Sequence, residues 1–323
     1  MRIALSHIMG MADEGRLPAE SKMTHTRQTL LESLGIGVVD FHCRAHVEAL
    51  GPEEPNPAHS IVFVRRGVFR RTQGDDSLVA DPNHVLFFNG GEAYRYSHPL
   101  PGGDECTILE MDGRRARELV EAHAPRDAER AQAPFRHGFG LASPSLARRH
   151  YELLALLRDG APSFSIEDAA SELADGAVAA AYRMRGTGTR ERTSAAAQRR
   201  RRDLVEAAKI VLNDRVESLP SLGALARSLD CSPFHLSRTF HRLLGSSLRA
   251  YVCRLRARRA AGLLAAGARD LTDLALALGY ADHSHLTNAF RREWGLPPSR
   301  FRERHGRRPA PGKILQARSG TRP

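Results

Sequence analysis

The chain has 323 residues, enough for two domains, and a formal net charge of +11 from 48 Lys and Arg against 37 Asp and Glu. From Arg199 onward there are 25 Lys and Arg against 10 Asp and Glu, whereas the first 198 residues carry 23 against 27, an asymmetry typical of a nucleic-acid binder with an appended domain. The sequence lacks a membrane-length apolar run, a signal-peptide core and any C-x-x-C pair, so a cytoplasmic protein without a membrane partner, zinc framework or disulfides is expected.

Residues 1–30 are polar and mixed, which predicts a loose N-terminal arm. Short β-branched and aromatic runs then alternate with Gly, Pro, Asn and Asp, a pattern that predicts a small barrel or sandwich. Apolar residues recur next at helical spacing, so two helices are expected to follow the strands within one domain, 31–184. The predicted strands include 61–64, 68–69, 85–88 and 107–109, and the predicted helices cover 146–157 and 166–184.

Residues 185–202 have no apolar periodicity and contain four consecutive arginines at their end, which predicts a flexible basic linker. Helical periodicity occupies 203–304, and the remaining 305–323 are expected to be disordered. Because the linker separates the two parts, 203–304 is expected to fold and to bind nucleic acid by itself.

The helical region contains one apolar frame twice, L-x3-F-x4-G-x2-[LP]-x2-[YF]. The first copy consists of Leu236, Phe240, Gly245, Leu248 and Tyr251. The second copy consists of Leu286, Phe290, Gly295, Pro298 and Phe301. Such a duplication predicts two copies of one helical unit.

Each copy is preceded by a small residue four positions before a turn residue, Ala226 before Asp230 and Ala275 before Gly279. The small residue lets two helices cross closely, and Gly or Asp accepts the left-handed backbone of the turn. These features predict helix-turn-helix units at 222–243 and 271–294, with Ser221 and Asp270 as N-caps.

A long helix from about Leu248 to Ala266, ended by Gly267, is expected between the two units. At 1.5 Å per residue it would be roughly 28 Å long. Successive major-groove segments on one side of B-DNA are about 34 Å apart. The helix could therefore place two recognition helices in adjacent turns of one groove.

The residues expected to contact DNA lie opposite the apolar positions of each second helix. Arginine can read guanine and asparagine can read adenine, whereas the alternative is that these side chains form a solvated surface. Trp294 is expected in the core rather than on this surface. In the first unit the candidates are Phe234, Ser237, Arg238, His241 and Arg242. In the second they are His283, Ser284, Thr287, Asn288 and Arg291.

Residues 203–304 resemble the DNA-binding domain of the AraC/XylS family of bacterial transcription regulators. The segments that carry the resemblance are 273–280, 283–286, 289–291 and 295–301. It implies base contacts by Phe234, Ser237 and Arg238 in the first unit and by His283, Ser284, Thr287 and Asn288 in the second. Asn288 stands where many members have arginine. The implied partners are double-stranded promoter or operator DNA and RNA polymerase.

The N-terminal region is similar to the cupin-like sensor domains of such regulators, through segments 62–69 and 81–94. The fold class expected is therefore α+β and multidomain: a cupin-like β-barrel with trailing helices, then an all-α domain with two helix-turn-helix units joined by a long helix. A small-molecule effector or a homodimer through the barrel is implied. Enzymatic cupins carry an H-x-H motif, which the barrel region lacks, and Tyr94 stands where their later His would be expected, so no metal, catalytic residue or cofactor is expected.

Together these features predict a non-enzymatic, sequence-specific transcription regulator, an activator by resemblance. Two alternatives stay open. One is a metal-dependent cupin enzyme fused to a DNA-binding module, with His42 and His46 as the residues to test. The other is a nonspecific nucleic-acid binder, which would show no sequence preference at any salt concentration. Cys43 and Cys106 are expected to be small buried hydrophobic residues rather than redox sensors.

Overall fold

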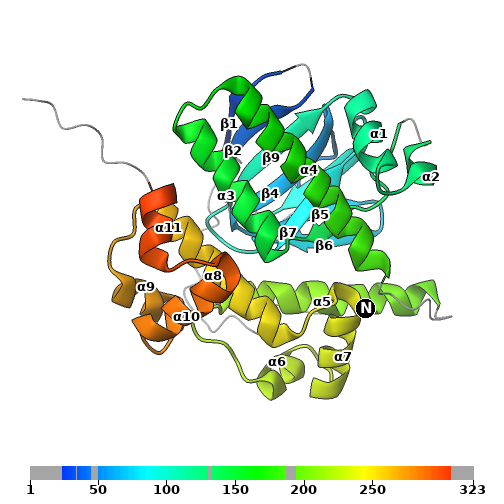
Figure 1. The fold of residues 1–323 in the computed structure, drawn as a ribbon. Coiled ribbons are helices and arrows are strands. Elements are labelled where there is room, and N and C mark those ends of the chain that lie inside the picture. The colour runs from blue at the N-terminus through cyan, green and yellow to red at the C-terminus, as the bar shows by residue number, and fades with distance from the viewer. Residues whose placement is uncertain (1–23, 34, 45–49, 130–131, 187–193, 307–323) are drawn as a thin grey trace, which may run out of the picture.

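The computed structural model describes residues 24–33, 35–44, 50–129, 132–186 and 194–306. Its N-terminal half is built from short antiparallel strands and four helices (Figure 1). The strands are β1 (Thr24–Leu31), β2 (Gly37–Arg44), β3 (Glu54–Pro55), β4 (His59–Gly67), β5 (Phe69–Gln73), β6 (Asp76–Ala80), β7 (His84–Phe88), β8 (Ala93–Ser97), β9 (Asp104–Met111) and β10 (Phe139–Leu141).

The strands form two sheets, one of six strands in the order β1-β2-β9-β4-β7-β10 and one of four in the order β3-β8-β5-β6. An apolar cluster fills the space between them. Its buried members come from both sheets, which confirms the expected small β-domain. They are Val62, Val64, Phe69, Leu78, Ala80, Leu86, Phe88, Tyr94 and Cys106.

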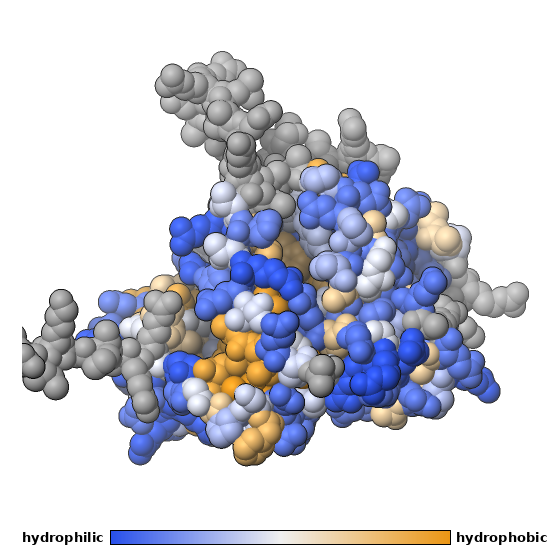
Figure 2. Space-filling model, turned by 90° about the horizontal axis from the view of Figure 1, so that it is seen from above, coloured by the Kyte–Doolittle hydropathy of each residue, from blue (hydrophilic) through white to orange (hydrophobic). Residues whose placement is uncertain are grey.

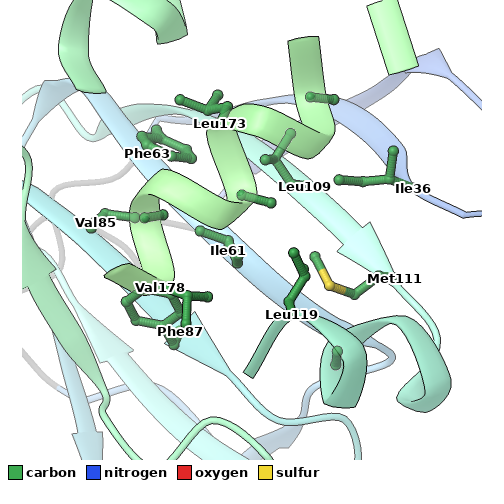
Figure 3. Packing of buried hydrophobic residues seen from close by; sticks show 14 of the residues in the cluster. Ile36, Ile61, Phe63, Val85, Phe87, Leu109, Met111, Leu119, Leu173 and Val178 are labelled. Atoms are coloured by element: carbon green, nitrogen blue, oxygen red, sulfur yellow. The ribbon is translucent and has the colours of Figure 1, made fainter. Parts of the chain in front are cut away.

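A second core lies between the outer face of the six-stranded sheet and the helices (Figure 3). Strand β4 shows how one sequence serves both cores: Ile61 and Phe63 join the helix-side cluster, whereas Val62 and Val64 face the other sheet. Ala-rich α4 packs closely on β10, where a Cβ on Gly140 would come within 3.1 Å of the backbone of Ala181. The helices are α1 (Gly113–Glu121), α2 (Pro125–Ala128), α3 (Pro144–Arg158) and α4 (Ser163–Gly186).

The C-terminal half is helical, and its two helix-turn-helix units coincide with the predicted ones. Asp230, with φ 51°, and Gly279, with φ 70°, make the two left-handed turns. Ser221 and Asp270 cap the following helices through their side chains, as expected. The helices are α5 (Ala195–Asp214), α6 (Leu222–Ser228), α7 (Pro233–Leu244), α8 (Leu248–Ala265), α9 (Leu271–Ala277), α10 (His283–Trp294) and α11 (Pro298–His305).

Three expected boundaries need correction. Residues 24–30 of the predicted loose arm belong to β1, whose exposed side chains gave no hydrophobic signal although its backbone pairs with β2. The predicted linker 185–202 overlaps the end of α4 and the start of α5. Arg199 and Arg202 form ion pairs with Asp75 and Asp76 at 2.6 and 3.2 Å, which hold this part of α5 against the β5–β6 turn. Residues 187–193 and 307–323 lie outside the described part.

The two halves share a core, contrary to the expectation of linked but separate domains. The ring of Tyr151 in α3 packs with its centroid 5.1 Å from those of Trp294 in α10 and Phe301 in α11. Ala147 of α3 belongs to the same buried cluster. The structure thus places the N-terminal half directly against the helices that follow it (Figure 1).

The face seen in Figure 2 is mostly hydrophilic, with hydrophobic side chains gathered in one patch. Among the described residues, no helix combines the length and apolar character needed to cross a bilayer.

Candidate nucleic-acid interface

Helix α7 is fixed at both ends by its own sequence. The hydroxyl of Ser232 accepts a hydrogen bond from the backbone N–H of His235 at 3.1 Å, and Gly245 ends the helix with φ 62°. Leu236 and Phe240 are fully buried beneath it. These anchors leave the opposite face of α7 free of core packing.

That opposite face carries the side chains predicted from the helical period. Phe234 is 72% exposed, which is unusual for a large aromatic residue, and Arg238 and His241 are exposed beside it. Ser237 and Arg242 are partly buried at the edges. The structure therefore brings the five candidates of the first unit onto one side of one helix.

Helix α10 repeats this construction. Asp282 caps it by accepting a hydrogen bond from the N–H of His285 at 2.7 Å. Leu286 and Phe290 are fully buried, and Trp294 is a core residue as predicted, with its indole Nε1 donating to the carbonyl oxygen of Ala257 at 3.1 Å.

The outward face of α10 holds the five candidates of the second unit. His283, Ser284, Asn288 and Arg291 are exposed, and Thr287 is partly buried. Their types differ from those at the matching positions of α7. The two helices therefore present different donors and acceptors on equivalent frameworks.

Helix α8 connects the units and is anchored in both. Its 18 residues span roughly 27 Å at the standard rise. Near its start the ring of Tyr251 packs edge-on against Phe240, with centroids 5.2 Å apart, and near its middle Ala257 accepts the hydrogen bond from Trp294. The spacing of the two recognition helices thus depends on one helix held at both units.

A cleft of about 700 Å³ lies between α7 and the end of α4. Three predicted reading residues, Arg238, His241 and Arg242, line one wall. Arg183 of α4 and Arg254 of α8 add two guanidinium groups. Sequence reasoning missed these two arginines because Arg183 lies in a separate helix before the basic region, and Arg254 lies on the connecting helix rather than on a recognition helix.

Residues 225–304 match the family model described as a helix-turn-helix domain. The match covers both units whose geometry is given above. This chain carries an AraC-type helix-turn-helix domain. The resemblance drawn from the repeated frame is confirmed for this part of the chain.

Three similar proteins differ in how much of this chain they cover. The bifunctional transcriptional activator/DNA repair enzyme AdaA of Bacillus subtilis is 30% identical over 83 residues, which are 26% of this chain and 39% of AdaA. An AraC-type transcriptional regulator from Chromobacterium violaceum has 23% identity and a TM-score of 0.31 over 35% of this chain and 96% of its own. Apo ToxT from Vibrio cholerae has 10% identity and a TM-score of 0.36 over 84% and 98%.

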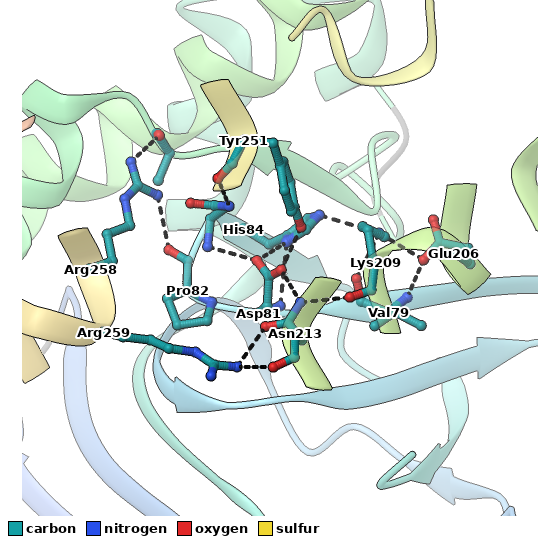
Figure 4. Close-up of polar contacts among 12 residues, drawn as sticks. Val79, Asp81, Pro82, His84, Glu206, Lys209, Asn213, Tyr251, Arg258 and Arg259 are labelled. Carbon is teal, nitrogen blue, oxygen red and sulfur yellow. Dashed lines mark hydrogen bonds and ion pairs between the residues drawn. The ribbon is translucent and has the colours of Figure 1, made fainter. Parts of the chain in front are cut away.

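A buried polar network joins the AraC-type domain to the β-domain (Figure 4). At its centre Asp81, fully buried after β6, accepts hydrogen bonds from the hydroxyl of Tyr251 in α8 and from Nδ2 of Asn213 in α5, at 2.5 and 2.7 Å. Nδ1 of His84 is 2.9 Å from the same carboxylate. Burial alone would raise the pKa of Asp81, but His84, Tyr251 and Asn213 hold it below its ordinary value.

Helix α5 covers the exposed edge of the four-stranded sheet with two side chains. Glu206 accepts a hydrogen bond from the backbone N–H of Val79 at 2.5 Å, and Nζ of Lys209 donates to the carbonyl oxygen of Val79 at 2.7 Å. Lys209 is fully buried and its Nζ is 3.3 Å from Nε2 of His84. Edge strands present unpaired backbone groups, and here the first helix of the C-terminal half satisfies them.

The β-domain also contains a buried group of possible metal ligands. The ligand atoms of Cys43, His98 and Asp104 all lie within 4.8 Å of one another. Sequence reasoning expected no metal site and missed this group because the three residues share no motif spacing. The expected burial of Cys43 and Cys106 is confirmed.

His42, one of the two histidines of the enzyme alternative, does not belong to this group of ligands. His42 is partly exposed on β2, with Nε2 3.1 Å from the carboxylate of Asp40. His46 lies outside the described residues.

Proposed function

We propose that the chain is a sequence-specific DNA-binding transcription regulator with a single asymmetric recognition surface. The observation that carries this proposal is the pair of exposed, differently composed faces on α7 and α10, held by matched buried cores at the two ends of α8. A solvated surface would need neither the matched cores nor a 72% exposed phenylalanine. Because the chain corresponds to 39% of AdaA, activities of that relative outside the shared segment are not carried over.

In this proposal α7 and α10 enter successive major-groove segments. Arg238 would bond O6 and N7 of a guanine, Phe234 would contact a thymine methyl, and Asn288 would bond N6 and N7 of an adenine. Arg183 and Arg254 would contact phosphates at the edge of the cleft, because they flank the α7 face without belonging to it. The proposed DNA-contacting set is otherwise Phe234, Ser237, Arg238, His241, Arg242, His283, Ser284, Thr287, Asn288 and Arg291.

The β-domain is proposed to control this surface. A small-molecule effector or a homodimer through the β-domain would alter how Asp81, His84 and Lys209 hold α5 and α8. The cleft between α4 and α7 supports an anionic effector, since guanidinium groups line both of its sides. The regulator would act in the cytoplasm of a bacterium and would reach RNA polymerase from its promoter site.

In the enzyme alternative His42 would bind the metal ion, but in the structure it pairs with Asp40 on an open strand. The other alternative is a protein that binds nucleic acid without sequence preference. Measuring affinity for two DNA sequences over a range of salt concentrations distinguishes it from a sequence-specific regulator. Anisotropy titrations of the full chain against a selected site and a scrambled site should both weaken with salt, while the selected site keeps a preference of roughly 10³-fold or more. Equal affinity for both sequences at every salt concentration would contradict the proposal.

Effector control is tested on the same complex. Small carboxylates and phosphates are added to the preformed complex with the selected site, and an effector that occupies the cleft should change the apparent Kd. The matched variant is Arg183→Ala, which should reduce that response while leaving the folded protein intact because Arg183 is exposed. A response that is identical in this variant would place the effector elsewhere.

A further inference from the structure

Two neighbouring strands and one loop bring three metal-type ligands together inside the β-domain, Cys43, His98 and Asp104, and a fourth, Cys106, lies beside Asp104. Strands β2 and β9 pair so that Cys43 is directly opposite Asp104 and Phe41 is opposite Cys106. The two cysteines therefore lie on neighbouring strands, two residue pairs apart along the ladder. His98, which follows β8, has Nε2 2.7 Å from Asp104. The thiol of Cys106 is 3.1 Å from the other carboxylate oxygen of Asp104.

All four side chains are removed from solvent. Cys43 and Asp104 are 5% exposed, His98 is 2% and Cys106 is 1%. Buried polar groups normally find complete sets of hydrogen-bond partners. Nδ1 of His98 and the hydroxyl of the adjacent Ser97 are buried without such a partner among the described residues.

Two thiols, one imidazole and one carboxylate form a donor set suited to Zn²⁺. Zinc takes four ligands at about 2.0–2.3 Å in a tetrahedral arrangement, so its ligand atoms are about 3.3–3.8 Å apart. To reach that geometry the 2.7 Å distance between His98 and Asp104 would lengthen, and the larger distances of up to 4.8 Å among Cys43, His98 and Asp104 would shorten. Thiolates and burial disfavour Mg²⁺ and Ca²⁺, which prefer oxygen ligands and water.

We propose that the β-domain binds one Zn²⁺ ion through Cys43, His98 and Asp104, with Cys106 as the fourth ligand. Four protein ligands in a buried position make a closed, structural site rather than a catalytic one. The ion would tie β2 and β9 to the loop between β8 and β9. This inference does not depend on the proposed DNA binding.

The site also lies close to the contact between the two halves of the chain. A Cβ on Gly67 would come within 2.0 Å of the carbonyl oxygen of Gly103, so the end of β4 is pressed against the loop that leads to Asp104. Two residues earlier, the carbonyl oxygen of Arg65 approaches Gly262 of α8. Zinc binding should therefore stabilise the part of the β-domain that supports the connecting helix.

The test uses the full chain, stripped with a chelator and then titrated with Zn²⁺ or Co²⁺ in the absence of DNA. We expect one ion per chain by native mass spectrometry, thiolate-to-cobalt charge-transfer absorption, and a higher Tm with zinc. Cys43→Ser and Cys106→Ser should each weaken zinc binding at least about 100-fold, the upper end of the loss seen for residues that only support a ligand. Cys231→Ser and Cys253→Ser are matched controls outside the cluster and should bind zinc normally.

A measurement on the unmodified chain covers the case in which a variant fails to fold. Zinc should protect the peptides that contain Cys43 and Cys106 from alkylation in mild denaturant, while Cys253 reacts at the same rate with and without the ion. Folded protein that retains no stoichiometric zinc would overturn the proposal. Zinc that leaves the alkylation of Cys43 and Cys106 unchanged would overturn it as well.

Discussion

Arg258 of α8 and Glu293 near the end of α10 form a buried ion pair at 2.8 Å. The same guanidinium donates hydrogen bonds to the carbonyl oxygens of Pro82 and Ala142, at 2.9 and 2.6 Å, in the N-terminal half. One side chain therefore connects the second recognition helix with the β-domain, and Figure 4 shows its contact with Pro82. A displacement of Pro82 or Ala142 would therefore also disturb the ion pair that holds α10 against α8.

Replacing Arg258 with Met should destabilise the protein strongly. The substitution leaves the buried carboxylate of Glu293 and two carbonyl oxygens without a donor, and removing one partner of a buried pair costs about 3–5 kcal/mol. Urea unfolding followed by fluorescence of Trp294, the single tryptophan, measures the free energy of unfolding. The matched control is Arg300→Met, whose exposed pair with Glu303 should contribute about 0–1 kcal/mol. Similar losses for both variants would contradict this role of Arg258.

Arg238→Ala should relax specificity at one base position. Loss of a bidentate contact costs about 1–3 kcal/mol at that position and leaves binding to unrelated DNA nearly unchanged. Competition titrations with single-base variants of the selected site locate the effect. Arg114→Ala on the exposed surface of α1 is the control and should leave every affinity unchanged. An equal loss on all sequences would assign Arg238 to the phosphate backbone instead.

The stability of the protein should fall as the pH is lowered from 7 to 5. Burial first, then the charges of Arg65 and Arg258, lower the pKa of His150 to about 3. The unfolded chain takes up this proton below about pH 6.5 while the folded chain does not, so His150 alone removes about 2 kcal/mol by pH 5. His84, whose pKa burial and Lys209 also lower, acts in the same direction.

The control for this pH dependence is His150→Gln, which keeps a donor near Thr107, 2.8 Å from Nε2 of His150 in the structure. The free energy of unfolding of the variant should vary less with pH, by about 2 kcal/mol over the same interval. Identical pH profiles for the variant and the original chain would show that His150 is already protonated or exposed.

Substitution of the two turn residues should change stability by very different amounts. A Cβ on Gly279 would meet the carbonyl oxygen of Glu217 at 2.0 Å in a left-handed backbone, so Gly279→Ala should cost more than about 2 kcal/mol. Asp230 is a non-glycine residue with a left-handed backbone, which glycine adopts without strain. Asp230→Gly should therefore change stability by less than about 1 kcal/mol. Thermal unfolding of both variants measures the difference, and a tolerated Gly279→Ala would contradict the described packing of this turn.

The sequence predicted the helical half well because its signals are local. The repeated apolar frame, the caps at Ser221 and Asp270 and the turns at Asp230 and Gly279 each depend on neighbours within a few residues. The reading faces followed from the 3.6-residue period once Leu236 and Phe240 were placed inside. Whether each of these ten side chains contacts DNA stays a prediction.

The contacts between the halves could not be predicted, because they join residues far apart in the sequence. Asp81 and Tyr251, or Lys209 and Val79, share no spacing pattern, and a fully buried lysine contradicts the usual preference of its type. For the same reason the cluster around His98 was missed. The predicted linker 185–202 is too long because the first residues of α5 are exposed and lack apolar periodicity. Ion pairs rather than apolar contacts hold this part of the helix.

Whether 203–304 folds by itself stays a prediction, and the packing between the halves shows which contacts such a fragment would lose. A fragment covering 194–306 would expose Lys209, Tyr251 and Arg258, all buried in the full chain. It should unfold at lower urea concentration than the full chain, in which Trp294 fluorescence and hydrogen exchange of β7 should report one shared transition. A fragment as stable as the full chain would contradict the energetic importance of this interface.

Selection of preferred DNA from a random pool by the full chain tests the central claim most directly. The account predicts an asymmetric site with two contacted segments about 10 base pairs apart, one weakened by Arg238→Ala and the other by Asn288→Ala. A pool that shows no enrichment, or a site in which both variants affect the same base pair, would contradict it.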